Sequence, residues 1–251
     1  NISGSEGLVA AGNIFMGMTE SPVLIKNYLP TMNRSEIFLV MVSGMGTIAG
    51  SVMGTYIGML GGTDPAAKVL FATHLLSASV MAVPGSIVLA KMLCPQTEEA
   101  TDHVAISGKE KENSNILDAI SSGTVTGVKL MTNIAAMLLV FISLVALANY
   151  ITEGVIGRYT GLNDWIVKIT DGKAQGLTFQ FILGVITSPF MWLIGVPSQD
   201  IMLVGSLLGQ KTILNEFVAY FQLQQWKDAG LFMYEKSILM STYILCGFAN
   251  I

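Results

Sequence analysis

Two carboxylates are the first candidates for chemistry, because each lies in an otherwise apolar segment rich in small residues. Glu20 lies in the segment 2–29 and Glu216 in the segment 196–223. A carboxylate at membrane depth is costly, so it persists only where it faces protein or a water-filled cavity. There it accepts hydrogen bonds from a ligand. The alternative is that both residues cap helices or lie in exposed turns, and Pro22 is compatible with such a turn.

The two acidic segments repeat each other at a spacing of about 195 residues. Each begins with polar residues, 3–6 or 197–200, and each carries a polar residue next to its carboxylate, Thr19 or Asn215. Paired apolar segments with polar interruptions are typical of secondary transporters. If each segment is a helical hairpin, its tip exposes unpaired backbone N–H and C=O groups. Carbonyl groups at such a tip suit a sodium ion.

Composition indicates a membrane protein. Of the 251 residues, 52% are hydrophobic and 12% are charged, whereas about a quarter are charged in soluble domains. The net charge of −4 offers no basic face, so we expect no nucleic-acid partner. The two cysteines, Cys94 and Cys246, lie in or beside apolar stretches. We therefore expect neither a disulfide framework nor a zinc site.

Five stretches approach or reach the length of about 20 apolar residues that a membrane-crossing helix needs. They are residues 37–60, 69–90, 131–149, 178–196 and 237–251. The predicted fold class is therefore an all-α, polytopic membrane protein. The chain begins at Asn1 without a methionine and ends in an uncharged run at Ile251, so we expect it to be a fragment of a longer protein.

A dinucleotide-binding fingerprint is the main competing interpretation. Gly44-x-Gly46-x-x-Ala49 follows the strand-like residues 37–42, and Asp64 lies 20 residues after Gly44. However, glycines recur at every fourth position from Gly46 to Gly62, which is typical of a close-packed face on a transmembrane helix. No nucleophile elbow, P-loop or paired-histidine motif is present in the sequence. We therefore expect a protein that is not an enzyme and binds no organic cofactor.

Five motifs, in this order, resemble those of the concentrative nucleoside transporters. They are residues 13–22 (NIFMGMTESP), 35–36 (SE), 47–52 (TIAGSV), 215–220 (NEFVAY) and 247–250 (GFAN). The resemblance implies sodium-coupled symport of nucleosides by a homotrimer in the plasma (inner) membrane. It also implies an inverted-repeat core with two re-entrant helical hairpins and broken transmembrane helices.

The organisation that the resemblance implies has six parts. These are the first hairpin and broken helix (1–60), a transmembrane helix of the transport domain (61–94), a polar loop (95–122), a long scaffold helix (123–155), an interfacial segment with an apolar helix (156–196), and the second hairpin with the start of a second broken helix (197–251).

The resemblance also assigns site residues. Sodium is expected at Asn13, Met16, Thr47 and Ile48, with backbone carbonyls from Met16 and Ile48 and a hydroxyl from Thr47. Oxygen ligands of this kind suit a hard cation. The nucleoside is expected at Gly17, Met18, Thr19, Glu20, Val52, Glu216, Phe248 and Asn250.

Met18 departs from the family pattern, which usually has a glutamine that hydrogen-bonds the base at this position. Methionine packs against a ring but is a weak acceptor, so we expect an altered base selectivity. Proton coupling remains an alternative to sodium coupling, and a membrane receptor or structural subunit is a further alternative to a transporter.

Overall fold

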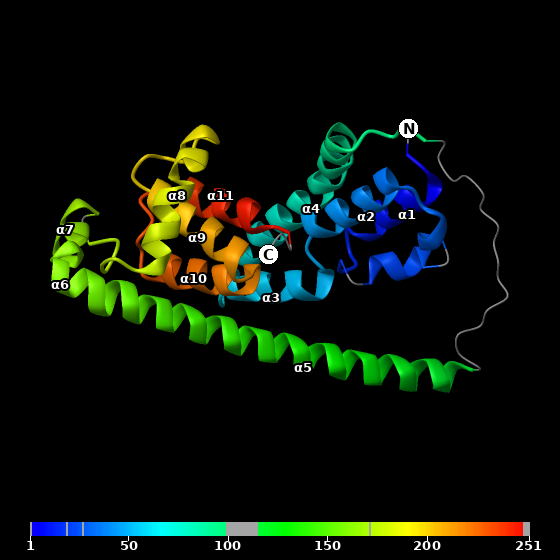
Figure 1. Ribbon diagram of the computed structural model, residues 1–251, viewed down its shortest axis with the longest axis horizontal. Helices are drawn as coiled ribbons and strands as arrows, with labels where there is room; N and C mark the ends of the chain where they lie inside the picture. The colour runs from blue at the N-terminus through cyan, green and yellow to red at the C-terminus, as the bar shows by residue number, and fades with distance from the viewer. Residues whose placement is uncertain (1, 19, 27, 99–114, 171, 248–251) are drawn as a thin grey trace. The chain divides into compact units, whose positions relative to one another are not determined.

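The structure is a computed structural model that describes residues 2–18, 20–26, 28–98, 115–170 and 172–247. Throughout these residues it contains helices and no strand (Figure 1), as predicted. The chain divides into two compact units, one formed by Asn1–Asp102 and Gln180–Ile251, the other by His103–Phe179. All the candidate site residues belong to the first unit.

The first hairpin begins with helix α1 (Gly4–Gly12). Its N-terminus is closed by a capping box, in which Glu6 N–H donates to Ser3 Oγ at 3.4 Å and Ser3 N–H donates to Glu6 Oε2 at 2.7 Å. The chain then turns and returns through two short 3-10 helices, η1 (Ser21–Ile25) and η2 (Leu29–Thr31). Contacts between α1 and η1 make these two arms one hairpin.

The predicted broken helix follows the hairpin. Helix α2 (Arg34–Gly46) and helix α3 (Gly50–Gly61) are separated by residues 47–49, where Thr47 and Ala49 have extended backbones. The peptide groups of the break cannot join the helical ladder, so they need partners from elsewhere. One partner is the hairpin, because Gly50 N–H donates to the carbonyl of Phe15 at 2.9 Å. The break near Thr47 is thus held by a segment that precedes it in the chain.

The dinucleotide-binding alternative is wrong, because residues 37–42 lie inside α2 rather than in a strand. The predicted close packing along the glycine ladder occurs only at its start. A Cβ at Gly46 would meet Ala82 and Ser86, which lie in the helix Pro65–Leu93. Gly54 and Gly58 have no such neighbour within 4 Å among the described residues.

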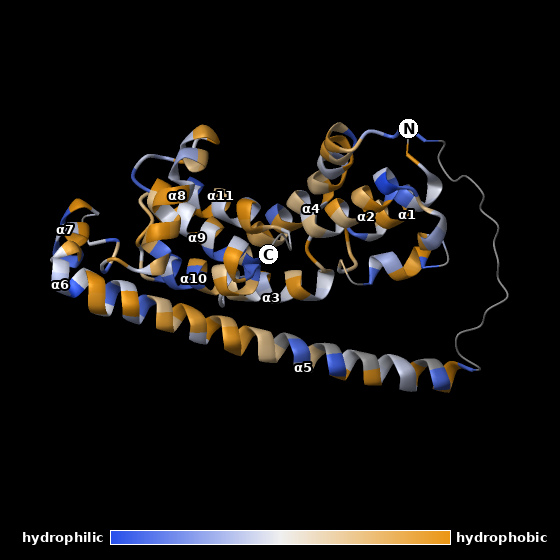
Figure 2. Cartoon of the chain, viewed as in Figure 1, coloured by the Kyte–Doolittle hydropathy of each residue, from blue (hydrophilic) through white to orange (hydrophobic). Residues whose placement is uncertain are grey.

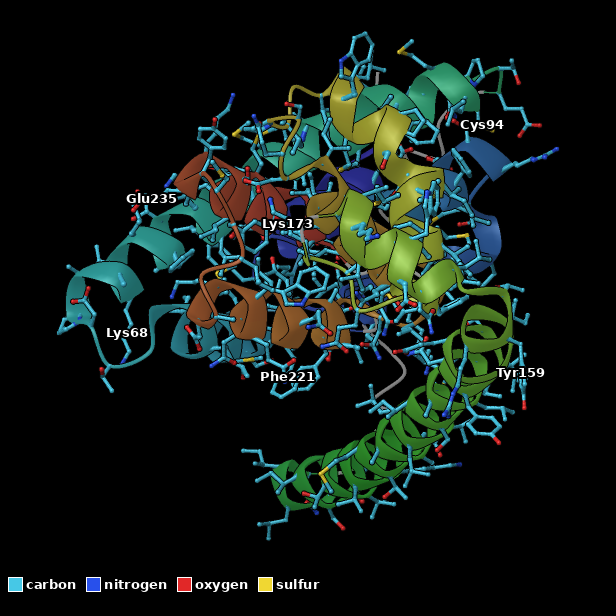
Figure 3. All side chains as sticks on the ribbon, turned by 90° about the vertical axis from the view of Figure 1, so that its left-hand side faces the viewer. Lys68, Cys94, Tyr159, Lys173, Phe221 and Glu235 are labelled. Carbon is cyan, nitrogen blue, oxygen red and sulfur yellow. The ribbon has the colours of Figure 1, made fainter. Side chains whose placement is uncertain are left out.

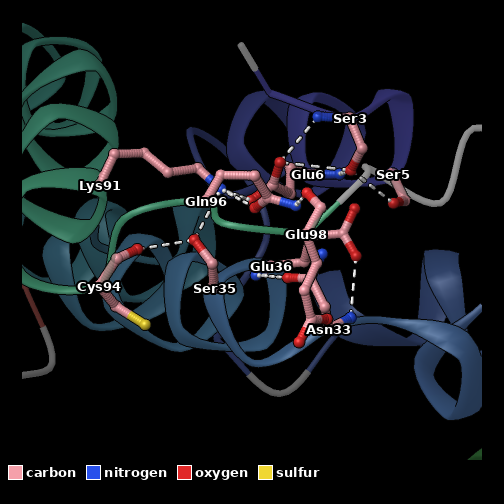
Figure 4. Close-up of polar contacts among 10 residues, drawn as sticks. All are labelled: Ser3, Ser5, Glu6, Asn33, Ser35, Glu36, Lys91, Cys94, Gln96 and Glu98. Carbon is pink, nitrogen blue, oxygen red and sulfur yellow. Dashed lines mark hydrogen bonds and ion pairs between the residues drawn. The ribbon is translucent and has the colours of Figure 1, made fainter.

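Helix α4 (Pro65–Leu93) packs along both α2 and α3. Near its C-terminal end, Lys91 Nζ donates to Glu6 Oε1 at 2.6 Å and to Ser35 Oγ at 3.1 Å (Figure 4). Glu6 is 1% exposed and Lys91 18% exposed, so this ion pair is largely shielded from solvent. It ties the start of the first hairpin to α2 and α4. A cavity of about 460 Å³ lies beside it, lined partly by Ser35, Phe38 and Cys94.

The C-terminal part of the same unit contains four helices. They are α8 (Phe179–Leu193), α9 (Ile201–Ile213), α10 (Glu216–Asp228) and α11 (Glu235–Leu245). Helices α9 and α10 pack against each other as the second hairpin, and α11 packs on α9, α10 and α4. The buried Asp200 carboxylate accepts hydrogen bonds from the backbone N–H groups of Met233 and Tyr234, at 3.0 and 3.1 Å. It thereby joins the start of α9 to the start of α11.

The second unit contains α5 (Ile116–Asn149), a π-helical stretch η3 (Tyr150–Gly157), α6 (Arg158–Thr160) and α7 (Leu162–Ile169). Helix α5 begins at Ile116 rather than at the expected position 123, because Asn115 caps it by accepting from Asp118 N–H at 2.9 Å. Its C-terminal half is the more hydrophobic (Figure 2). Tyr159, labelled in Figure 3, projects from α6 and is 87% exposed.

Within the described residues, three helical runs are long and apolar enough to cross a membrane. They are Arg34–Gly61, Pro65–Leu93 and Ile116–Thr160, with 28, 29 and 45 residues. They include the first three predicted spans. The stretch 178–196 contains the 15-residue helix α8, and the described part of 237–251 contains α11, which ends at Leu245. These last two helices are shorter than the bilayer core requires.

Candidate functional site

The tip of the first hairpin buries an unpaired oxygen next to the helix break. Asn13 is 0% exposed, and its Nδ2 donates to Ser43 Oγ of α2 at 2.9 Å. Its Oδ1 is also buried and has no hydrogen-bond partner in the described part of the chain. A buried acceptor without a partner is destabilising unless a ligand completes it. The Oδ1 atom of Asn13 is therefore a buried oxygen that can bind a ligand.

The break itself supplies the neighbouring oxygen atoms. Thr47 is 1% exposed, and its hydroxyl makes a long contact of 3.4 Å to the Ser43 carbonyl. Ile48 is 0% exposed, and its N–H donates to Ser79 Oγ of α4 at 3.4 Å. Both Asn13 and Thr47 thus contact Ser43. Met16 lies on the same tip, beside the Phe15 carbonyl that binds Gly50.

These residues fit a monovalent hard cation. The structure shows no cluster of three or more His, Cys, Asp or Glu side chains within the residues it describes, which is the donor set that transition metals use. The Asn13 amide oxygen, the Thr47 hydroxyl and nearby backbone carbonyls are neutral oxygen donors of the kind that hard cations prefer. The unpaired Oδ1 of Asn13 is the observation on which this fit rests.

The rest of the hairpin tip packs along the broken helix. A Cβ at Gly17 would overlap the Glu20 carboxylate and lie 3.4 Å from Ala49 Cβ, so only glycine fits there without movement. Met18 lies against Gly44, where a Cβ would be 3.1 Å from Met18 Cβ. Glu20 is exposed and its side chain does not cap η1. Of the two carboxylates expected to be shielded, only Glu216 is buried in the structure.

Glu216 is the buried carboxylate of the second hairpin. It is the first residue of α10, directly after Asn215, whose side chain caps the helix by accepting from Val218 N–H at 2.9 Å. Glu216 is 7% exposed, and its Oε2 has no hydrogen-bond partner among the described residues. Asn215 is therefore the capping residue, and one oxygen atom of the Glu216 carboxylate is left without a hydrogen-bond partner in the described part of the chain.

The structure adds Tyr56, which sequence analysis missed. Tyr56 is 0% exposed and stacks on Tyr220 of α10 with ring centroids 4.0 Å apart. Its hydroxyl is buried without a hydrogen-bond partner in the described part of the chain, and it interacts electrostatically with Glu216. The available signal was the spacing, because Tyr56 lies one helical turn after Val52, on the same face of α3.

One face of α3 connects the two parts of the site. Ile48 at the break and Tyr56 belong to one buried apolar cluster with Ala219 and Tyr220 of α10, and Val52 packs against it. The cation-site residues and the neighbourhood of Glu216 are thus linked through a single rigid helix.

The C-terminal end of α11 reaches the same region. Gly247 follows α11 with φ +108, and a Cβ there would lie 2.7 Å from the carbonyl oxygen of Met45. This close approach, which a side chain would block, packs the end of α11 against the end of α2. Thr19, Phe248 and Asn250 were also predicted as site residues, and they lie outside the described residues.

Known proteins resemble the chain over nearly its whole length. The chain is 38% identical over 251 residues to an uncharacterized transporter of Haemophilus influenzae, covering 99% of this chain and 55% of that protein. It is 36% identical over 260 residues to human solute carrier family 28 member 3 and 37% identical over 261 residues to rat sodium/nucleoside cotransporter 2. These alignments cover 98% of this chain but only 34% and 36% of those proteins. The chain thus spans about a third to about half of the relatives it matches.

Solved structures also match the chain over nearly its whole length. CNTnw in an inward-facing substrate-bound state matches with a TM-score of 0.75 and 35% identity, over 99% of this chain and 54% of that one. A CNTnw variant in an intermediate state matches with a TM-score of 0.78 and 36% identity, over 100% of this chain and 55% of that one. These structural relatives are transporters and not enzymes, and they share the fold with re-entrant hairpins and broken helices.

A family model described as Na+ dependent nucleoside transporter C-terminus matches residues 74–251. That match covers well over half of the chain; it begins within α4 and includes the whole second hairpin. Together with the solved relatives, it confirms the resemblance read from the motifs: the chain is part of an integral membrane protein and belongs to the concentrative nucleoside transporter family.

Proposed function

We propose that the protein is a sodium-coupled symporter that carries nucleosides across the membrane. The observation that carries the proposal is the buried, unpaired Oδ1 of Asn13 at the point where the first hairpin meets the break of the α2–α3 helix. A sodium ion there would be held by Asn13, Thr47 and the carbonyls of Met16 and Ile48. The names of the rat and human relatives support the substrate and the ion.

Coupling would follow from the elements that both ligands share. Sodium bound between Asn13 and Thr47 would fix the hairpin tip against α3. Gly17, Met18, Thr19 and Glu20 would then be held in position to take the nucleobase. The same face of α3 continues through Val52 to Tyr56, beside Glu216. Each ligand would therefore raise the affinity for the other by the same factor.

On the other side of the site, Glu216 would accept hydrogen bonds from the sugar hydroxyls. A buried carboxylate with a free oxygen atom is well suited to this, because a charged acceptor makes stronger hydrogen bonds than a neutral one. Phe248 would line the pocket and Asn250 would add a polar contact to the sugar. The loaded hairpins would then move across the plasma membrane within a homotrimer, as the family resemblance implies.

Uptake of radiolabelled uridine and adenosine into proteoliposomes that contain the whole protein tests this function. We expect accumulation driven by an inward sodium gradient, and no accumulation when choline replaces sodium at constant pH. Binding without accumulation would identify a receptor instead. Nucleoside-independent sodium flux would contradict coupling.

Proton coupling is the second candidate, and the structure offers one observation in its favour. The Glu216 carboxylate is buried with a free Oε2 atom, and a buried carboxylate can take up a proton in place of a cation. Uptake that follows a proton gradient at constant sodium concentration, and that Glu216→Gln makes independent of pH, would favour this alternative over sodium coupling.

A further inference from the structure

The second hairpin carries a buried lysine that no part of the proposed mechanism uses. Lys211 lies in the last turn of α9 and is 6% exposed. Its ammonium donates to the carbonyl of Ile244 at 3.0 Å and to the carbonyl of Cys246 at 3.4 Å. These carbonyls lie at the C-terminal end of α11, where the last turn of a helix leaves its oxygen atoms without helical partners.

The position of this ammonium parallels that of the sodium site. In the first repeat, Asn13 lies at the end of α1 and faces the interrupted helix that follows, with one oxygen atom unpaired. In the second repeat, Lys211 lies at the end of α9 and faces the end of α11. Each hairpin thus places a polar side chain near the C-terminal end of the helix that follows it, α2 for the first hairpin and α11 for the second. The first places a side-chain amide there, whose Nδ2 binds Ser43 Oγ and whose Oδ1 is unpaired among the described residues. The second places a positive charge there.

We propose that the ammonium of Lys211 is a tethered cation that occupies, in the second repeat, the place equivalent to the sodium site of the first. The inference rests on the proposed sodium symport and deepens it, because it bears on how many sodium ions move with each nucleoside. A lysine side chain is covalently attached, so its ammonium travels with the protein and is released on neither side of the membrane. It therefore satisfies the carbonyls of α11 without drawing on the sodium gradient.

The charges near Lys211 are consistent with this role. Its ammonium interacts electrostatically with the Glu216 carboxylate, so the two buried charges offset each other. Tyr220, on the same hairpin, donates from its hydroxyl to the Thr242 carbonyl at 2.8 Å and satisfies another oxygen atom of the same helix end. A small neutral residue at position 211 would leave Glu216 and the carbonyls of Ile244 and Cys246 without a cation. Such oxygen atoms are ligands that a free hard cation prefers.

The test measures sodium and nucleoside uptake together in proteoliposomes that contain the whole protein. In Lys211→Ser, which removes the charge and opens space beside the carbonyls, we expect the ratio of sodium to nucleoside to rise by about one ion, with a steeper dependence of uptake on sodium. Lys211→Met removes the charge but fills the space with an apolar chain, so it should show no rise. Lys211→Arg keeps the charge and should keep the wild-type ratio.

Thermal unfolding in detergent gives a readout that does not require transport. Sodium should stabilise Lys211→Ser more steeply than the wild-type protein, with choline chloride as the ionic-strength control. An unchanged ratio and an unchanged sodium dependence in Lys211→Ser would overturn the inference, and so would an equal gain in Lys211→Met. A Lys211→Ser protein that is unfolded at every sodium concentration would also overturn it.

The wild-type protein separates this inference from the proposed function. If wild-type uptake is independent of sodium, the proposed symport fails, whereas a sodium ion gained by Lys211→Ser relative to wild type still supports the tethered cation.

Discussion

The backbone N–H of Gly50 donates a hydrogen bond of 2.9 Å to the carbonyl of Phe15. Phe15 lies on the tip of the first hairpin, and Gly50 is the first residue of α3. This one bond connects the residues that would hold sodium to the helix that leads to Glu216. It makes the hairpin tip and the break a single unit, so a change at either should alter both ligand affinities.

Gly50→Ala tests that bond. A Cβ at position 50 would lie 3.2 Å from the Phe15 carbonyl oxygen, which is tight enough to push the hairpin tip away. We expect the apparent sodium affinity to fall by about tenfold, equivalent to about 1.4 kcal/mol, measured by sodium titration of nucleoside uptake. Gly54→Ala is the matched control, because a Cβ there meets none of the described residues within 4 Å. It should leave sodium affinity unchanged and should raise the thermal stability slightly. Equal losses in both variants would count against the role of the bond.

Thr47→Ala removes a hydroxyl that is 1% exposed and is held by only a long 3.4 Å contact to Ser43. Because that contact is weak, stability should change little, while sodium loses one oxygen ligand. We expect nucleoside binding to weaken about tenfold at low sodium and to recover at saturating sodium, since the two ligands are linked. Isothermal titration at two fixed sodium concentrations measures this. Thr47→Ser keeps the hydroxyl and should resemble the wild type, and equal loss at both concentrations would refute the sodium assignment.

Tyr56→Phe separates a ligand contact from a structural one. The Tyr56 hydroxyl is buried without a hydrogen-bond partner in the described residues, while its ring stacks on Tyr220. Removing only the hydroxyl should therefore leave the melting temperature unchanged or raise it. If the hydroxyl completes the nucleoside site beside Glu216, binding should weaken by about 1 kcal/mol, or about fivefold. A lower melting temperature with normal affinity would show that the hydroxyl is purely structural.

Particular residues show how far sequence predicts this site. The pairing of two hairpins was visible because polar residues interrupt apolar runs in matching places, and the broken helix within residues 1–60 was implied by the family resemblance. Tyr56 was missed although its spacing from Val52 was a signal, because an aromatic residue on a transmembrane helix looks like ordinary packing and Glu216 is distant in sequence. The role of Lys211 was hidden for the same reason, because only the fold brings its ammonium to the carbonyls of α11.

Exposure is equally difficult to predict from sequence. Glu20 and Glu216 occupy matching positions in the two repeats, yet Glu20 is exposed and Glu216 is buried. Glu216 is covered because Asn215 caps α10 and thereby fixes the first turn of the helix against α3. Glu20 instead precedes a short 3-10 helix and has no capping hydrogen bond.

Met18→Gln addresses base selectivity. Met18 lies against Gly44 and is 40% exposed, so its thioether can pack on a ring but accepts hydrogen bonds poorly. A glutamine at this position would add an amide that can hydrogen-bond the base edge, worth about 1 kcal/mol for a base that matches it. We therefore expect the preference order among competing purine and pyrimidine nucleosides to change in uptake assays. Met18→Leu should preserve the wild-type order, and an unchanged order in Met18→Gln would end the hypothesis.

The buried ion pair of Glu6 with Lys91 gives a stability prediction that is independent of transport. The two side chains are 1% and 18% exposed and 2.6 Å apart, so removing one partner leaves a buried charge behind. We expect Lys91→Met to destabilise the protein by about 3–5 kcal/mol, whereas Glu6→Gln combined with Lys91→Met should recover much of that loss. Asp228→Asn is the control, because Asp228 is 62% exposed and 4.0 Å from Lys227, and it should change stability by less than about 0.5 kcal/mol. Thermal or denaturant unfolding in detergent measures all of these variants. If the double variant is no more stable than Lys91→Met, the buried pair is not what fixes the first hairpin to α4.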